Sequence, residues 1–204
     1  MFKNKFKGKF IAIEGLDGCG STTQTLRIEN YLKKIKKPYL VTNEPTNNVI
    51  GGIIKAYVEG DIKLTSPASL QLLFAADRAN HLEQEIIPNL KGGINVITDR
   101  YFLSSLAYGA LNIADDGWLY NINDLFLIPD LTILIKTSAK TCVKRIKANR
   151  LGVELFENED KLKKVWNNYE MLSKKYPNIS VVDGEKSEDE VFSDIQKEID
   201  KIIK

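Results

Sequence analysis

The stretch Phe10-Ile-Ala-Ile-Glu-Gly-Leu-Asp-Gly-Cys-Gly-Ser-Thr-Thr-Gln24 decides the fold of this chain. Its first four residues are apolar and predict a short buried strand. Glycines follow, and they allow a tight turn. Apolar residues at helical spacing then predict a helix over residues 22–37. A strand, a glycine turn and a helix in this order are typical of a βαβ unit in a parallel sheet.

The glycine turn fits a phosphate-binding loop. Gly15 to Thr22 follows the Walker A pattern, in which glycine, four residues and glycine precede a lysine and a hydroxyl residue, but Ser21 stands where the lysine is usual. Backbone N–H groups in such a loop converge on phosphate, and the helix N-terminus adds positive charge. Thr22 would then bind Mg²⁺. The alternative, a structural turn that merely needs positive φ, explains the Thr22-Thr23 pair less well.

The rest of the chain alternates apolar runs with helix-like segments. Strands are expected at 39–42, 95–98, 131–135 and 179–182, and helices at 50–58, from Ser66 to about Pro88, 104–111, 140–148, 160–175 and after the capping box at Ser187. Strands without polar alternation indicate a sheet buried on both faces. We therefore expect one α/β domain over residues 1–204, with the three-layer P-loop fold and a five-stranded parallel sheet flanked by helices.

The composition excludes several classes of protein. The 204 residues carry 29 Lys plus Arg and 27 Asp plus Glu, a net charge of +2 that argues against a nucleic-acid binder. The sequence contains no run of about 18 apolar residues, so it predicts no transmembrane helix. Cys19 and Cys142 are the only cysteines, and we expect free thiols in the cytoplasm. For Cys19, a structural role as a small residue that fits the turn is favoured over a redox role.

Arginine is scarce compared with lysine. Among the 29 basic residues, 24 are lysines and the other five are Arg27, Arg78, Arg100, Arg145 and Arg150. Arginine offers a planar, bidentate fork of donors that suits phosphate groups. The few arginines are therefore candidates for ligand contacts.

Two further segments carry candidate site residues. In Asp99-Arg100-Tyr101, after the third strand, the acid would hold Mg²⁺ or its water shell and the arginine would clamp a phosphate. In the helix near residue 74, Phe74 and Arg78 are four residues apart and share a face, as a base-stacking ring and a cation would. The only histidine, His81, is expected on the helix surface.

These pieces, in this order, resemble the thymidylate kinases, which are nucleoside monophosphate kinases of the P-loop group. Glu-Gly-x-Asp-Gly, Phe-Ala-Ala-Asp-Arg and Asp-Arg-Tyr together form a specific combination, and the likeness covers nearly the whole chain. The matching stretches are 13–24, 43–45, 72–82, 96–101, 104–108 and 129–132.

The resemblance implies transfer of the ATP γ-phosphoryl group to dTMP, giving dTDP and ADP, with Mg²⁺ and usually in a homodimer. The positions that match the family's phosphate loop are Gly15, Leu16, Asp17, Gly18, Cys19, Gly20, Ser21, Thr22 and Thr23. Thr22 and Asp99 match the metal site, and Asp99 also matches the catalytic acid.

The resemblance also assigns residues to the dTMP site. Asp17 matches an acid near the sugar 3′-hydroxyl, and Arg100 matches the arginine that holds the dTMP phosphate. Phe74 and Arg78 match the ring stacked on thymine and the arginine beside it. The remaining matches are Glu44 of the Glu-Pro motif, Ser105, and Tyr108 near the deoxyribose.

Three departures from the family pattern stand out. Ser21 replaces the lysine, Asn43 and residues 46–48 replace a common Arg-Glu-Pro-Gly-Gly-Thr run, and Gly109 stands where many members have glutamine. Because the phosphate loop has no cation of its own, we expect Arg145 or Arg150 to supply one to the transferring phosphoryl group. Both lie in the segment 140–159, which matches the family's mobile lid.

Two alternatives stay open at this point. One is a related kinase that acts on another nucleotide or on a nucleoside, because Gly109 departs from the family pattern. The other is a nucleotide-binding protein without turnover, which the missing lysine favours. The acceptor-site residues count against it, because an ATP sensor has no need of an acceptor site.

Overall fold

The computed structural model describes residues 1–64, 66–149 and 158–203. Its centre is a five-stranded parallel sheet with the strand order β3-β4-β2-β6-β7. The strands are β2 (Phe10–Gly15), β3 (Tyr39–Asn43), β4 (Asn95–Asp99), β6 (Leu131–Lys136) and β7 (Ile179–Asp183). The predicted five-stranded parallel sheet is therefore confirmed.

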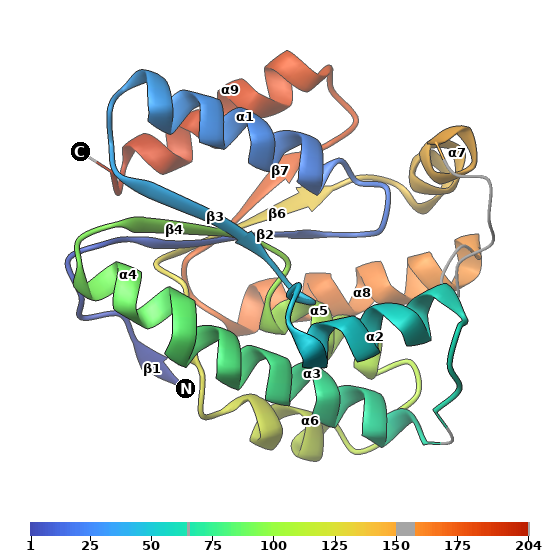
Figure 1. Cartoon of the computed structure of the whole chain (residues 1–204). Helices are drawn as coiled ribbons and strands as arrows, with labels where there is room; N and C mark the ends of the chain where they lie inside the picture. The colour runs from blue at the N-terminus through green and yellow to red at the C-terminus, as the bar shows by residue number, and fades with distance from the viewer. Residues whose placement is uncertain (65, 150–157, 204) are drawn as a thin grey trace.

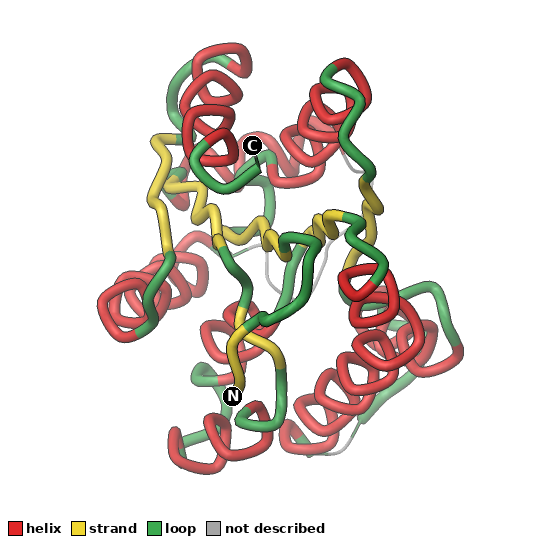
Figure 2. Tube along the Cα trace, turned by 90° about the vertical axis from the view of Figure 1, so that its left-hand side faces the viewer, coloured by secondary structure: helices red, strands yellow, loops and turns green. Residues whose placement is uncertain are grey.

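Helices cover both faces of this sheet, which makes three layers (Figures 1 and 2). One face carries α1 (Ser21–Lys34) and α9 (Glu188–Asp200), and the other carries α4 (Ile87–Lys91), α5 (Phe102–Gly109) and α8 (Glu159–Lys175). Since both faces are covered, β2 is buried along its whole length. This burial explains its uninterrupted apolar run.

The remaining helices surround the carboxyl ends of the strands or extend the layer formed by α4, α5 and α8. They are α2 (Val49–Glu59), α3 (Pro67–His81), α6 (Asp116–Asn123) and α7 (Ala139–Asn149). The predicted helix from Ser66 to Pro88 is one continuous helical path, but a π-helical turn, Leu82–Ile86, separates α3 from α4. The predicted capping box at Ser187 is present at the start of α9.

Two features of the fold have no clear pattern in the sequence. α6 is short and begins within the polar run Asp115-Asp-Gly, which resembles a loop; its N-cap is the Asp115 carboxylate, which accepts a hydrogen bond from the Trp118 N–H at 3.0 Å. The strands β1 (Phe2–Lys3) and β5 (Leu127–Ile128) pair in a second, two-stranded sheet that is too short to leave a pattern. No helix in the described part of the chain is long and apolar enough to cross a membrane.

Candidate active site

Two neighbouring cavities among those at the carboxyl ends of the strands are lined by the predicted site residues. The larger, about 940 Å³, is lined by the glycine loop, the end of β3, Asp99 and Arg145. The smaller, about 220 Å³, lies between α3 and α5 and is lined by Phe74 and Tyr108 among others. The residues that border both cavities are Asp17, Glu44, Pro45 and Arg100. The two cavities therefore meet, and a ligand in one would face a ligand in the other.

The glycine loop has an open side and a packed side. Gly20 precedes α1 with φ +98°, and a Cβ added to it would meet nothing within 4 Å. A Cβ added to Gly18 would lie 2.7 Å from the carbonyl oxygen of Cys142, because α7 packs closely there. The open side of the loop is thus left free for a phosphate group.

Cys19 supports the loop from below. Its side chain is buried, and burial raises the pKa of its thiol to about 11. A thiol with this pKa stays protonated at neutral pH and is a poor nucleophile. The interpretation of Cys19 as a small residue that fits the turn agrees with this placement.

Thr22 and Asp99 meet across the floor of the larger cavity. The Thr22 hydroxyl donates a hydrogen bond of 2.7 Å to Asp99 Oδ2. Asp99 Oδ1 is buried and has no hydrogen-bond partner among the described residues. A hydroxyl beside an unpartnered carboxylate oxygen suits Mg²⁺, which takes one or two protein ligands and completes its shell with phosphates and water. Within the described ranges no group of three or more His, Cys, Asp or Glu offers a larger site.

Arg100 turns sharply out of β4. Its φ of +72° lies in the left-handed region, which costs a residue with a side chain about 1–3 kcal/mol. The backbone is held there by its N–H, which donates to the Ile13 carbonyl at 2.9 Å, and by the Thr98 hydroxyl, which donates to the Arg100 carbonyl at 2.8 Å. The turn aims the guanidinium at the Gly15 carbonyl and at Asp17, 2.7 Å away.

Glu14 lies at the start of α5, next to the turn at Arg100, and was not anticipated as a site residue. Its fully buried carboxylate accepts hydrogen bonds from the N–H groups of Tyr101 and Ser104, and from the hydroxyls of Ser104 and Tyr169. Burial raises the pKa of Glu14 to about 7, although the charge of Arg100 opposes the shift. The only signal in the sequence was an acid that directly continues an apolar strand.

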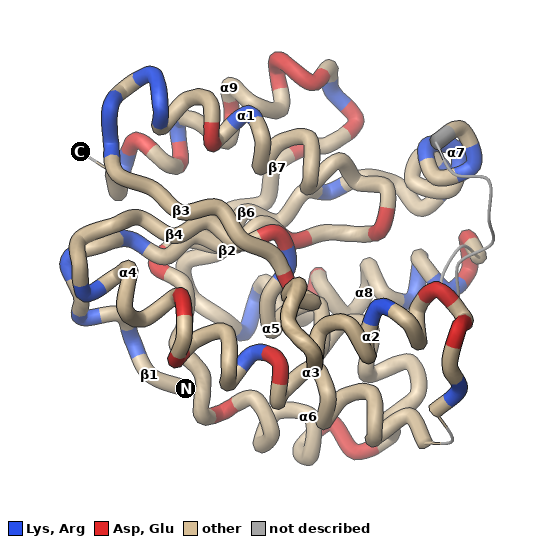
Figure 3. Tube along the Cα trace, in the orientation of Figure 1, with Lys and Arg blue, Asp and Glu red and all other residues tan. Residues whose placement is uncertain are grey.

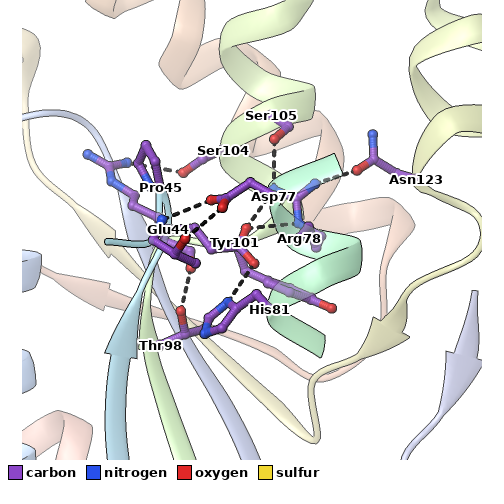
Figure 4. A network of polar contacts seen from close by, with 12 residues as sticks. Glu44, Pro45, Asp77, Arg78, His81, Thr98, Tyr101, Ser104, Ser105 and Asn123 are labelled. Carbon is purple, nitrogen blue, oxygen red and sulfur yellow. Dashed lines mark hydrogen bonds and ion pairs between the residues drawn. The ribbon is translucent and has the colours of Figure 1, made fainter. Parts of the chain in front are cut away.

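Arg78 is almost completely enclosed, with 1% of its side chain exposed (Figure 4). Its nitrogens donate to Glu44 at 2.9 Å, to Asn123 at 2.6 Å and to Ser105 at 2.8 Å. The guanidinium also lies over the ring of Tyr101, 5.1 Å from its centre. The sequence predicted Arg78, Glu44 and Ser105 as separate contacts to a ligand, and the structure joins them in one network.

The prediction that His81 lies on the helix surface is wrong. The residue is 3% exposed, and its Nδ1 is 3.1 Å from Glu44 Oε1 (Figure 4). Its Nε2 is 2.8 Å from the Thr42 hydroxyl and 3.0 Å from Glu85. Because Thr42 and Glu44 are about 40 residues away in the sequence, helical spacing alone did not predict these partners.

The other predicted acceptor residues gather at the smaller cavity. Phe74 and Tyr108 both line it. The Tyr108 hydroxyl accepts a hydrogen bond of 2.9 Å from the Asp17 N–H, and the Arg100 guanidinium lies 5.8 Å from the centre of the Tyr108 ring. The residues common to both cavities thus come from the glycine loop, from the segment after β3 and from the turn after β4.

Arg145 reaches the phosphate loop from α7. Its guanidinium donates to the carbonyl oxygens of Cys19 at 3.2 Å and Gly184 at 3.1 Å. Arg150, the other expected lid cation, lies outside the described residues. Arg27, which had no expected role, forms an ion pair of 2.7 Å with Asp189 on α9.

This arrangement defines a class of protein. A glycine loop at a helix N-terminus, a paired Thr22 and Asp99, and a second cavity that meets the first at Arg100 are the parts of a P-loop kinase that binds a small phosphate acceptor.

Comparisons with known proteins give the particular family. The family model described as thymidylate kinase matches residues 13–195. A probable thymidylate kinase of Thermococcus onnurineus is 38% identical over 91% of this chain and 94% of its own length. A probable thymidylate kinase of Pyrococcus horikoshii is 36% identical over 93% of this chain and 94% of its own length. A thymidylate kinase of Caldicellulosiruptor saccharolyticus is 33% identical over 97% of this chain and 98% of its own length. The chain belongs to the thymidylate kinase family, which phosphorylates dTMP to dTDP with ATP and Mg²⁺.

The raised pKa of Glu14 predicts a pH-dependent stability. Between an unfolded pKa of 4.5 and a folded pKa of about 7, the folded protein binds more protons than the unfolded chain, so its stability falls as pH rises. Glu14→Gln removes this loss, at about 1.4 kcal/mol per pKa unit, and its amide still suits hydroxyl partners that both donate and accept. Urea unfolding from pH 5 to 8 measures the difference.

Exposed Glu83→Gln serves as the matched control and should follow the wild-type pH dependence. Parallel stability curves for Glu14→Gln and the wild type would contradict the assignment of this slope to Glu14.

Proposed function

We propose that ATP occupies the larger cavity and dTMP the smaller, and that the chain transfers the γ-phosphoryl group between them where the cavities meet. The observation that carries this proposal is the place of Arg100 and Asp17 in the wall common to both cavities. A guanidinium at that point is next to both phosphate-bearing ligands, which suits direct in-line transfer without a covalent intermediate.

In the acceptor cavity, Phe74 stacks on the thymine base and Arg78 lies at its edge. Arg100 binds the dTMP phosphate, and Asp17 and Tyr108 lie beside the deoxyribose. The contacts of Glu44 and Ser105 go to Arg78, so we assign them a positioning role rather than direct contact with the base. These assignments are supported by the lining of the smaller cavity, which includes Asp17, Phe74, Arg78, Arg100 and Tyr108.

In the donor cavity, the loop residues 15–23 surround the ATP phosphates, and Thr22 and Asp99 hold Mg²⁺. The metal, when bound, neutralises charge on the phosphates. Asp99 is the metal-binding and catalytic acid, since its Oδ1 is the buried carboxylate oxygen left without a protein partner among the described residues.

Purified protein should form ADP from ATP faster with dTMP as the phosphate acceptor than with dUMP, dCMP or thymidine. Because Arg100 would bind the acceptor phosphate, Arg100→Ala should lower kcat/KM for dTMP by about 100-fold, roughly 2.7 kcal/mol of barrier. A coupled ADP-release assay measures both.

Arg27→Ala, which removes a surface arginine paired with Asp189, is the control and should keep wild-type kinetics. A preference for dUMP or dCMP would assign the chain to another nucleotide, and ATP binding without ADP release would indicate a non-catalytic protein.

Arg145 or Arg150 would replace the charge that is missing at Ser21. Support comes from the position of Arg145, whose guanidinium lies at the loop carbonyl of Cys19 and lines the donor cavity. Its hydrogen bonds there go to neutral carbonyls, so they leave its charge available to the phosphates of ATP.

Arg145→Ala should therefore lower kcat by about tenfold or more, roughly 1.4 kcal/mol, and Ser21→Lys should give no large gain in steady-state rate. Wild-type kcat in both Arg145→Ala and Arg150→Ala would contradict the role of these arginines. A gain of about 100-fold in Ser21→Lys would show instead that the loop is simply impaired.

A homodimer is supported by an apolar surface on α2 and α3. Val49, Ile53 and Leu72 are 82%, 39% and 51% exposed on these two packed helices. Residues 67–76 of α3 carry no charged side chain (Figure 3). Exposed apolar side chains on neighbouring helices with few charges are typical of a surface that meets another protein.

Leu72→Glu should place charge in this surface and convert a dimer to a monomer, which sedimentation velocity measures. Leu125→Glu is the control, because Leu125 is 80% exposed but lies outside α2 and α3. A wild-type protein that sediments as a 23.0 kDa monomer would overturn the proposal.

A cytoplasmic location without nucleic-acid partners completes the proposal. Both cysteines are buried free thiols, a state that suits a reducing compartment. The near-neutral net charge of +2 offers little attraction to nucleic acid. Fractionation of cells that express the tagged chain tests the location.

A further inference from the structure

Tyr169 on α8 brings a buried hydroxyl into contact with Arg100. The residue is 0% exposed, and its Oη lies 3.2 Å from Nη1 of Arg100. The Ser104 hydroxyl lies 3.3 Å from the same nitrogen and 2.8 Å from the Tyr169 hydroxyl. A helix that lines neither cavity with this residue thus reaches the guanidinium that borders both of them.

The Tyr169 hydroxyl joins Arg100 to Glu14. Its single proton is donated to Oε2 of Glu14 at 3.1 Å, and its oxygen then accepts from Nη1 of Arg100. Burial raises the pKa of Tyr169 well above its ordinary value, so the hydroxyl keeps this proton at neutral pH. A neutral tyrosine therefore lies between a cation and a carboxylate and has a hydrogen bond for each.

The ring of Tyr169 is fixed by its packing. It lies edge-to-face against Tyr108, with the ring centres 6.4 Å apart, and its centre is also 6.4 Å from that of Trp166 on the same helix. The neighbouring Asn168 donates a hydrogen bond of 2.8 Å to the carbonyl of Ala107, which ties α8 to α5. Packing of this kind locks the rotamer of a side chain that supports a site.

The partners of Arg100 leave one edge of its guanidinium for a ligand. Nη1 donates to the Gly15 carbonyl and contacts the hydroxyls of Ser104 and Tyr169. Nη2 donates to Asp17 at 2.7 Å, so the hydrogen bonds of this side chain to described residues use Nη1 and Nη2. The edge formed by Nε and the second N–H of Nη2 suits bidentate binding of a phosphate.

We propose that Tyr169 is a positioning residue for phosphoryl transfer, whose hydroxyl, together with that of Ser104, holds Nη1 of Arg100 so that the opposite edge meets the acceptor phosphate. This inference rests on the proposed function and deepens it. Phenylalanine at position 169 would keep the ring but remove one acceptor from the guanidinium. A misplacement of about 1 Å at a reacting group can cost about 100-fold in rate.

The test compares dTMP with thymidine, which has no phosphate for Arg100 to bind. Tyr169→Phe should lower kcat/KM for dTMP by about tenfold and weaken dTMP binding, whereas thymidine binding, measured by isothermal titration calorimetry, should not change. Ser104→Ala is a second variant and should act in the same direction. Tyr176→Phe is the matched control and should keep wild-type values, because half-buried Tyr176 packs on Phe102 at the far end of α8.

Arg100→Ala separates an effect through the guanidinium from a general loosening of the fold. Once the guanidinium is absent, Tyr169→Phe should cause no further loss of kcat/KM for dTMP, so the losses of the two single variants should not add. Additive losses, or an equal weakening of dTMP and thymidine binding, would show that Tyr169 only supports the fold and would overturn the inference.

The two proposals fail in different ways. Wild-type protein that phosphorylates dTMP, with Tyr169→Phe at the wild-type kcat/KM, overturns the role of Tyr169 and leaves the proposed function standing. Wild-type protein that does not phosphorylate dTMP overturns the proposed function, together with the role assigned here to Tyr169.

Discussion

The buried carboxylate of Glu14 is the constraint on which the site depends. Glu14 is the penultimate residue of the central strand β2 and is buried. Its carboxylate accepts hydrogen bonds from the start of α5 and from Tyr169 of α8. A buried polar group needs such partners, since each one left unmade would cost about 1–3 kcal/mol. The start of α5 and the turn at Arg100 are therefore fixed relative to the glycine loop by one side chain.

From this point the two cavities follow in physical order. β4 ends beside β2, so Asp99 reaches Thr22, and the left-handed turn at Arg100 carries the chain on into α5. α5 then supplies Ser105 and Tyr108 to the second cavity. Two adjoining cavities are in this way built at the carboxyl ends of adjacent strands, which is where parallel sheets generally place their binding sites.

The sequence predicted what depends on local pattern. The five strands are short apolar runs, of which the three inner ones, β4, β2 and β6, are buried along nearly their whole length. The glycine loop has a spacing of its own, so both were visible before the structure. His81 was misjudged and Glu14 was missed because their hydrogen-bond partners are brought together only by folding. α6 was missed because an aspartate that caps a helix resembles an aspartate in a loop. The role of Arg150 stays a prediction.

The network around Arg78 draws its members from four separate parts of the chain: Glu44 after β3, Arg78 on α3, Ser105 on α5 and Asn123 on α6. A buried charge tolerates the loss of one partner poorly, since such a loss costs about 3–5 kcal/mol. These positions are therefore expected to change together or not at all during divergence. A substitution at one of them would leave buried polar groups on the other segments without a partner, so each of the four segments restricts how the other three can change.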